Sequence, residues 1–512
     1  MKNFKIITYV LVGIFLLNSC AEDYLDTVPT SSTAPVTIFE TTENAALAIN
    51  GICKLMTRQY LSTQGFNGEG TIKMYYGNYP GNHLFTNLSG WAVIINGDYH
   101  ENVASIYDYY PWYYYYMLIG NANSVVAGID NAVGSEADKQ FIKAQALTFR
   151  AYAFLMLSQL YCERWMDSNN GASDGLVLRI DQSTGDMALS SLKETYDQIY
   201  ADLDDAIALY QSSGRTRERN YEPDINVAYA VYARAAITRQ DYSKAATMAV
   251  SARNGYPLMT NSEYKEGFYT PNQEWIWSSY GSLDETLFYY SYFAYIAYNS
   301  NASIVRGYPR CISKDLFNKI PATDVRRGLF LDPTGYSYTT STGKAGSALT
   351  AYARTLYPDI YSTSSVFAYM QFKIAAGDYP GVGNLNHFRS AEMYLIEAEA
   401  KYYSNNATGA QQALIALNKD SGRDPSYTCT KTGTDLLNEI KTYRGIELWG
   451  EGFDWFDLKR WGDPVSRTAY TDGGNFITVL AVTYGPSEKN KWVWKIPEKE
   501  TDYNKLIGAL PE

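Results

Sequence analysis

The fold is decided by the stretch RGIELWGEGFDWFDLKRW at residues 444–461, near the C-terminal end of the chain. If a helix continues through it from Leu436, then Arg444, Glu447 and Glu451 lie on one largely apolar stripe, because residues three and four positions apart share a helix face. A charged side chain on a buried stripe must be paired and hydrogen-bonded. We therefore expect Arg444 to contact Glu447, Glu451 or both, and we call residues 444–461 the clasp.

The two glutamates of the clasp also permit a catalytic interpretation. A general acid needs a carboxyl group with a raised pKa, whereas the neighbouring Arg444 would keep Glu447 and Glu451 ionised. The clasp is therefore interpreted as a structural feature that pins the last helices of the fold.

The composition indicates a globular protein. The chain has 512 residues, 46% of them hydrophobic, and can bury one large core or two medium ones. Its net charge of −11 disfavours nucleic acid as a partner. The three histidines are far apart and outside any HExxH spacing, so a zinc enzyme is not expected. We predict no metal and no cofactor.

The first twenty residues carry a targeting signal. Lys2 and Lys5 precede an apolar run at residues 6–17, too short to span a bilayer, and the box LNSC ends at Cys20. This pattern resembles a bacterial lipoprotein signal, in which residues 1–19 are removed and Cys20 is lipidated; the alternative is an ordinary secretory signal with a chance cysteine. Removal of residues 1–19, which contain Lys2 and Lys5, leaves 41 basic and 54 acidic residues and a net charge of 41 − 54 = −13. Several acyl chains on Cys20 would anchor the protein stably to a membrane.

The other cysteines show no CxxC spacing. A chain of this size needs no disulfide to stabilise it, so we expect lone buried thiols rather than pairs. The four residues concerned are Cys53, Cys162, Cys311 and Cys429.

Helical periodicity covers much of the chain after the signal. Small residues facing each other, such as Ala235 and Ala249, allow two antiparallel helices to pack closely, as in a tetratricopeptide-like hairpin. A second such hairpin is predicted from residue 391 to residue 419. The predicted helical regions are at about residues 43–60, 106–161, 192–253 and 388–461.

Two long segments lack this periodicity, at about residues 64–101 and 254–383. Within the second, residues 273–277 and 366–373 alternate like short strands. Long irregular segments are uncommon in compact domains unless they have a function. The predicted fold is therefore mostly α, with a tetratricopeptide-like helical scaffold and a loop-rich, short-strand portion that binds a ligand.

Several motifs, taken in order, resemble the SusD/RagB family of outer-membrane nutrient-binding lipoproteins of Bacteroidetes. The resemblance covers nearly the whole mature chain. The motifs are the lipoprotein signal followed by DYLD at 23–26, RAYAFL at 150–155, FRSAEMYLIEAEA at 388–400, the clasp, and IPEKETDYN at 496–504.

The resemblance implies a single domain at residues 20–512 of a non-catalytic lipoprotein on the surface of the outer membrane. Family members cap a TonB-dependent transporter of the SusC type and deliver oligosaccharides, less often peptides, for import. The expected partners are thus an oligosaccharide or polysaccharide, a SusC-type transporter, and the outer membrane through the lipid on Cys20.

The resemblance also places the ligand on the two irregular segments. With 48 tyrosines and 10 tryptophans, the chain has more aromatic residues than a core requires. Flat rings flanked by amides and carboxylates suit the apolar face and hydroxyl rim of a sugar, which favours glycans over lipids. For any single tyrosine, a place in the core is the alternative. The candidate ligand-binding residues are Trp91, Asp98, Tyr99, Tyr289, Tyr292, Tyr295, Tyr298, Asn301 and Arg306.

Two other functions stay open from the sequence. Aromatic platforms and acidic pairs also occur in glycoside hydrolases, and 54 carboxylates allow many pairings in space. No recognisable catalytic motif is present, so a hydrolase acting on surface-bound glycans is the weaker alternative. A peptide-binding member of the same family is the other.

Overall fold

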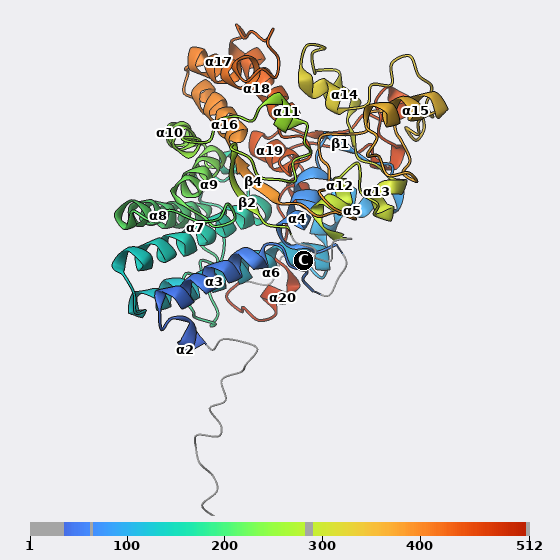
Figure 1. Ribbon diagram of the computed structural model, residues 1–512. Coiled ribbons are helices and arrows are strands. Elements are labelled where there is room, and N and C mark those ends of the chain that lie inside the picture. The colour runs from blue at the N-terminus through green and yellow to red at the C-terminus, as the bar shows by residue number, and fades with distance from the viewer. Residues whose placement is uncertain (1–34, 62–64, 282–289, 508–512) are drawn as a thin grey trace, which may run out of the picture.

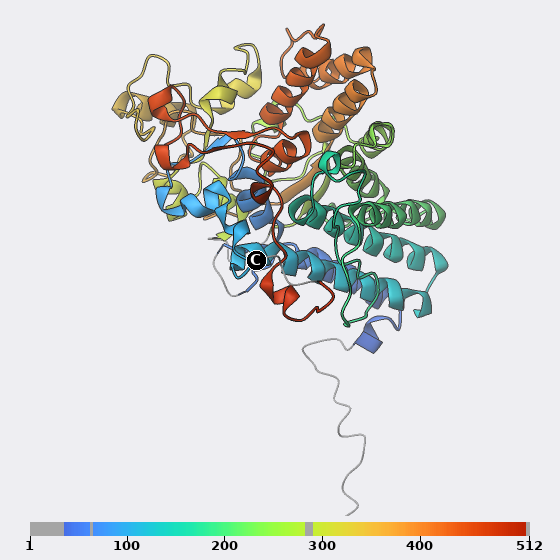
Figure 2. The same ribbon diagram turned by 180° about the vertical axis from the view of Figure 1, so that it is seen from behind.

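The computed structural model describes residues 35–61, 65–281 and 290–507. The predicted signal, Cys20 and Tyr289 lie outside these ranges. Figure 1 shows a stack of helices at the left and a loop-rich part at the upper right, and Figure 2 shows the same division from behind. Among the described residues, no helix is both long and apolar enough to cross a membrane. The mostly α fold predicted from the sequence is confirmed.

The helical half is built from long helices that pack against their neighbours in sequence. Helices α9 and α10 form one predicted hairpin and α16 and α17 the other, which confirms the tetratricopeptide-like arrangement. The turn of the first hairpin is capped, because the Asp241 side chain accepts a hydrogen bond from the backbone N–H of Lys244. The helices are α3 (Thr42–Leu55), α6 (Ile106–Gly128), α7 (Glu136–Tyr161), α8 (Leu192–Ser213), α9 (Ile225–Thr238), α10 (Tyr242–Ala252), α16 (Ser390–Tyr403) and α17 (Ala407–Ile415).

Helix α6 contains a proline beyond its first turn. Pro111 has no N–H to donate to the carbonyl of Tyr107, four residues earlier. The hydroxyl of Tyr76 donates to that carbonyl instead, at 2.6 Å. A tyrosine from another segment thus satisfies the group that the proline leaves without a helical partner.

Strands are few and short. In the described residues, β1 (Leu84–Phe85) pairs with β3 (Cys311–Ile312), β2 (Trp275–Ser279) with β4 (Leu385–Arg389), and β5 (Val465–Ser466) with β6 (Thr483–Tyr484), all antiparallel. Strand β2 confirms the prediction at residues 273–277. The strand predicted at residues 366–373 is wrong: its backbone makes single bridges to three different segments and no continuous ladder, and all eight residues are buried.

The segment predicted to be irregular at residues 64–101 is largely helical and buried. It contains α4 (Gly68–Thr71), a π-helix at Ile72–Asn78, a 3-10 turn at Ser89–Trp91 and α5 (Ala92–Asn96). The Glu69 carboxylate, 1% exposed, accepts hydrogen bonds from the hydroxyls of Tyr115 and Tyr152 in the helical half. The first part of this segment therefore crosses the centre of the molecule.

The clasp is not one helix. Helix α18 (Gly433–Glu447) ends inside it, and α19 (Asp454–Trp461) begins after a turn. Gly450 and Gly452 in that turn have φ angles of 80° and 91°, a region that glycine adopts without the steric cost of a side chain. Because α18 ends at Glu447, the side chains of Glu447 and Glu451 do not follow one helix face and instead contact residues of the loop-rich half.

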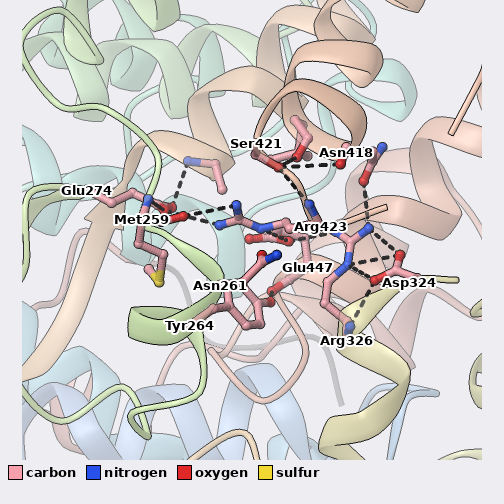
Figure 3. Close-up of polar contacts among 12 residues, drawn as sticks. Met259, Asn261, Tyr264, Glu274, Asp324, Arg326, Asn418, Ser421, Arg423 and Glu447 are labelled. Atoms are coloured by element: carbon pink, nitrogen blue, oxygen red, sulfur yellow. Dashed lines mark hydrogen bonds and ion pairs between the residues drawn. The ribbon is translucent and has the colours of Figure 1, made fainter. Parts of the chain in front are cut away.

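Glu447 is the centre of a buried network of ion pairs, shown in Figure 3. Its carboxylate lies 2.7 Å from Arg326 Nη1 and 2.7 Å from Arg389 Nη1, with Arg423 Nε at 3.3 Å. Arg389 and Arg423 also contact Glu274, and Arg326 pairs with Asp324. The network joins the end of α18 to β2, β4 and the loop-rich half.

Glu451 completes this network. Its carboxylate contacts Lys373 Nζ at 2.6 Å and Arg389 Nη2 at 2.8 Å. The four cations Arg326, Lys373, Arg389 and Arg423 thus face the four carboxylates Glu274, Asp324, Glu447 and Glu451, so the buried charges balance.

The expected partners of Arg444 are corrected by these contacts. Arg444 Nε lies 2.6 Å from Asp457 Oδ2 of α19, and neither Glu447 nor Glu451 is its partner. The reason is the turn between the two helices, which brings Asp457 back towards Arg444. The expected ionisation holds: Arg423, Arg389 and Arg326 keep the pKa of Glu447 well below its ordinary value, and Arg389 and Lys373 lower that of Glu451 to about 2.

Replacing Glu447 with Gln should destabilise the fold. The substitution leaves three arginines around a neutral amide, and breaking a buried ion pair costs about 3–5 kcal/mol of unfolding free energy. Glu439→Gln is a matched control on the same helix, because Glu439 pairs with the half-exposed Lys431 and its loss should cost less than about 1 kcal/mol. Denaturant unfolding measures both. Equal losses, or a well-folded Glu447→Gln protein that lost only ligand binding, would contradict the structural role.

The pH dependence of stability follows from Glu451. Its folded-state pKa of about 2 lies below the ordinary value of 4.5, so its stabilising contribution is complete above pH 4.5 and is lost as the pH falls from 4.5 towards 2. In Glu451→Gln the unfolding free energy should fall less steeply over this window, by up to about 1.4 kcal/mol per pH unit. Urea unfolding at several pH values tests this, and parallel profiles of the two proteins would refute it.

Candidate functional site

The two segments predicted to bind a ligand meet at Trp91 and Tyr295. Trp91 is the last residue of the 3-10 turn at Ser89–Trp91, and Tyr295 lies in α12 (Tyr292–Ile296). Their ring centroids are 5.9 Å apart, and the buried Tyr75 of the π-helix contacts both, at 6.1 Å and 5.8 Å. Trp91 is half-buried whereas Tyr295 is only 4% exposed, so Trp91 presents the accessible ring and the tyrosines support it.

A second aromatic group lies further along the same segment. The half-buried Tyr298 packs edge-on against Phe372, with centroids 5.4 Å apart, and Phe372 stacks on Tyr357 at 3.8 Å. Stacked and edge-to-face rings hold each other in fixed orientations. Tyr298 is therefore a supported ring at the surface.

Arg306 and Asn301 lie beside this group. Arg306, in α13 (Ser303–Gly307), stands over the ring of Tyr361 at 5.8 Å, and Tyr361 packs edge-on against the exposed Tyr379. Among the described residues, the side-chain oxygen of Asn301 is enclosed and accepts no hydrogen bond. Tyr361 and Tyr379 were missed from the sequence, because they stand singly among polar residues rather than in an aromatic run.

We call the residues Trp91, Tyr298, Asn301, Arg306, Tyr361 and Tyr379 the aromatic surface. The predicted residue Tyr295 is buried and supports Trp91 from beneath this surface, so it is not part of it. It lies on the loop-rich half, where α5, α12 and α13 are drawn close together in Figure 1. Half-buried rings beside an amide and a guanidinium can stack on an apolar ring face and hydrogen-bond its hydroxyls.

Two further predicted residues are part of the core, as Tyr295 is. Tyr99 is 3% exposed and donates from its hydroxyl to the carbonyl of Tyr75, and Tyr292 is 5% exposed and donates to the carbonyl of Gly450. Their rings cannot stack on a ligand in this structure, so we correct the prediction and leave both out of the aromatic surface. The physical reason is that each hydroxyl satisfies a backbone carbonyl of another segment.

Asp98 is exposed but already paired. Its carboxylate lies 3.3 Å from Lys491 Nζ, which also contacts Glu101 at 3.0 Å. Within the described residues, Asp98 pairs with Lys491 of the C-terminal segment and not with a residue of the aromatic surface. We therefore leave Asp98 out of the proposed site as well.

The turn between α18 and α19 holds the segments of the aromatic surface in place. The carbonyl of Gly450 accepts hydrogen bonds from Tyr292 Oη at 2.6 Å and from Asn78 Nδ2 at 2.7 Å, and that of Glu451 accepts one from Lys73 Nζ at 3.0 Å. Carbonyls at and beyond a helix end need such partners from outside the helix. The π-helix and α12 are thereby fixed to the clasp.

A separate groove lies in the helical half. It has a volume of about 480 Å³ and runs between α3, α7 and the loop at residues 215–222. Phe141 of α7 lines it, and none of the predicted ligand-binding residues does. This groove is the natural comparison for tests of the aromatic surface.

The cysteines and the possible metal ligands of the described chain were also predicted from the sequence. The four described cysteines are free and buried, as expected, and burial raises the pKa of the Cys162 thiol to about 12. No cluster of His, Cys, Asp and Glu suited to a metal ion occurs in the part of the chain that the structure describes.

Comparison with known families decides the identity. Residues 236–508, more than half of the chain, match the model of the SusD family. This chain belongs to the SusD family. Residues 23–237 match a second family model, described as starch-binding and associating with the outer membrane. A search of curated proteins finds no match.

Solved structures agree with the SusD fold. A SusD-like carbohydrate-binding protein from Bacteroides vulgatus is 23% identical, with a TM-score of 0.73 over 91% of this chain and 97% of that one. A SusD superfamily protein from Bacteroides thetaiotaomicron is 22% identical, with a TM-score of 0.71 over 92% and 100%. The surface glycan-binding protein A of Bacteroides thetaiotaomicron is 17% identical, with a TM-score of 0.66 over 92% and 98%. At these identities the likeness establishes the shared fold.

Proposed function

We propose that this SusD-family protein captures oligosaccharides on its aromatic surface without cleaving them. The observation that carries the proposal is the meeting of Trp91 with Tyr295 and Tyr75, which holds a half-exposed indole on a rigid base. A rigid aromatic ring loses little conformational freedom on binding, so stacking on a sugar is favourable. The similarity to a carbohydrate-binding and a glycan-binding protein supports the choice of ligand.

The proposal extends to location and partner. A lipid on Cys20 would tether the protein to the outer membrane, and a SusC-type TonB-dependent transporter would receive the captured glycan. The family model for residues 23–237, with its association with the outer membrane, supports this location. Co-purification of the full chain with a large outer-membrane barrel would test the partner.

The hydrolase alternative has little support from the carboxyl groups. Cleavage needs an accessible acid with a raised pKa beside a second carboxylate. Burial raises the pKa of Asp108 to about 9 and also raises that of Glu69, but these residues are 0% and 1% exposed. Glu447 and Glu451 are ionised and enclosed by cations. These four carboxyl groups are therefore poorly placed for glycan cleavage.

Replacing Trp91 with Ala should weaken oligosaccharide binding by at least about tenfold, as expected for a stacked aromatic anchor. Affinity electrophoresis across a glycan panel, followed by calorimetry on the best ligand, measures the effect, and a thermal melt checks the fold. Phe141→Ala, which removes a ring from the separate groove, is the control and should leave affinity unchanged. The reverse pattern would move the site to the groove.

Prolonged incubation of the purified protein with a bound glycan should yield no shorter products, because none of the residues assigned to the aromatic surface is a carboxylate that could serve as acid or nucleophile. Chromatography of the glycan before and after incubation tests this. Products that persist in a preparation of the Trp91→Ala variant would indicate a contaminating enzyme, whereas products that disappear with the variant would establish a hydrolase.

A further inference from the structure

Two arginines at the aromatic surface have no acidic partner. Among the residues that the structure describes, neither Arg306 nor Arg310 has a carboxylate oxygen within the 4.0 Å that defines an ion pair. Many buried arginines elsewhere are paired, for example Arg150 with Asp202 at 2.6 Å and Arg234 with Glu392 at 2.8 Å. The buried Arg467 instead donates to backbone carbonyls and to the Asn96 amide oxygen. Arg306 differs from Arg467 because it is only half-buried, so a ligand can reach it.

Arg310 lies behind the rings of the surface. It is 1% exposed, and its guanidinium donates to the Tyr79 hydroxyl at 2.8 Å and to the Thr86 hydroxyl at 3.2 Å. Tyr79 stacks on Tyr75 with centroids 5.8 Å apart, and Tyr75 contacts both Trp91 and Tyr295. Its Nε has no hydrogen-bond partner within the described residues. Within the described residues, no carboxylate therefore balances the positive charge of Arg310 beneath the aromatic rings.

Arg306 lies at the surface itself. One of its terminal nitrogens donates to the Thr363 hydroxyl at 2.8 Å, and its guanidinium faces the ring of Tyr361. In the described chain its Nε has no partner. A planar guanidinium presents several donors in a fixed fork that matches a carboxylate or sulfate, so Arg306 can receive an anionic group between the rings.

The positive charges of Arg306 and Arg310 favour a ligand that carries a negative charge. A buried cation without a counter-ion is costly, and an opposite charge brought near it lowers that cost. Because the protein carries a net charge of −11, a positive region differs from most of its surface. Asp359 and Asp378 also belong to this part of the chain, but both are exposed, where water and salt screen their charges.

We propose that the aromatic surface selects an anionic glycan, one that carries uronic acid or sulfate groups, with Arg306 contacting the anion and Arg310 providing a buried positive field. This inference rests on the proposed glycan-binding function and specifies its ligand. Carboxylate and sulfate present the same oxygen acceptors to an arginine fork, and the test below distinguishes them.

The test uses a panel of anionic oligosaccharides, each beside its neutralised form. Oligogalacturonides are compared with their methyl esters, and sulfated galactan oligosaccharides with their desulfated forms. For the glycans that bind, the anionic member should bind at least about tenfold more tightly, as expected for charge-assisted hydrogen bonds. The affinity of the anionic member should fall as salt rises from about 50 to about 500 mM, because charges are screened more strongly over this range.

Variants separate the two arginines. Arg306→Gln should weaken binding of the charged glycan much more than binding of the neutral one, so most of the preference is lost, and Arg306→Lys should restore part of it. Arg219→Gln, the same charge change on an exposed arginine of the helical half, is the control and should leave the preference unchanged. Arg310→Met should reduce the salt dependence, with a thermal melt to confirm folding.

The outcomes distinguish this inference from the proposed function. Equal binding of charged and neutral members, unchanged in Arg306→Gln, would overturn the anionic preference while leaving glycan binding intact. A preference that survives in Arg306→Gln but is lost with a substitution elsewhere would also overturn it. Absence of binding to every glycan of the panel would overturn both.

Discussion

The structure depends on the neutralisation of Glu447. This carboxylate is completely buried, and three arginines from separate segments surround it. A buried charge is tolerated only when it is paired, so β4, the loop before α18 and the 3-10 turn at Val325–Leu329 must all come together at this point. The ion network therefore specifies how the helical and loop-rich halves join, more than it adds to their net stability.

The same region positions the candidate binding surface. The turn after α18 offers carbonyl groups that a helix cannot satisfy, and Tyr292, Asn78 and Lys73 donate to them. These donors belong to α12 and the π-helix, which also carry Tyr295 and Tyr75. The Trp91 ring thus rests on segments that are tied to the clasp, and a rigid base of this kind favours stacking on a ligand.

The helical scaffold and the proposed ligand-binding surface are built from different residues. The scaffold residues of α9, α10, α16 and α17 are small or apolar and pack into one another. The aromatic surface instead exposes Trp91 and Tyr379 and leaves Arg306 and Arg310 without acidic partners in the described chain. Fold and ligand preference therefore rest on different residues.

The sequence by itself determined the mostly helical architecture and the two hairpins, because helical periodicity is a local property. It also indicated buried free thiols. It predicted that Glu447 and Glu451 are ionised, but it assigned this to Arg444, whereas Arg326, Arg389, Arg423 and Lys373 are the cations responsible. It could not determine that Arg444 binds Asp457, nor that Tyr99 and Tyr292 are buried while Tyr361 and Tyr379 belong to the surface. Those facts depend on contacts between distant segments: Tyr292 and Gly450 are 158 positions apart, and Glu447 and Arg326 are 121 apart. Only the tertiary structure decides which tyrosine hydroxyl donates to which backbone carbonyl, and hence which tyrosine rings stay accessible to a ligand.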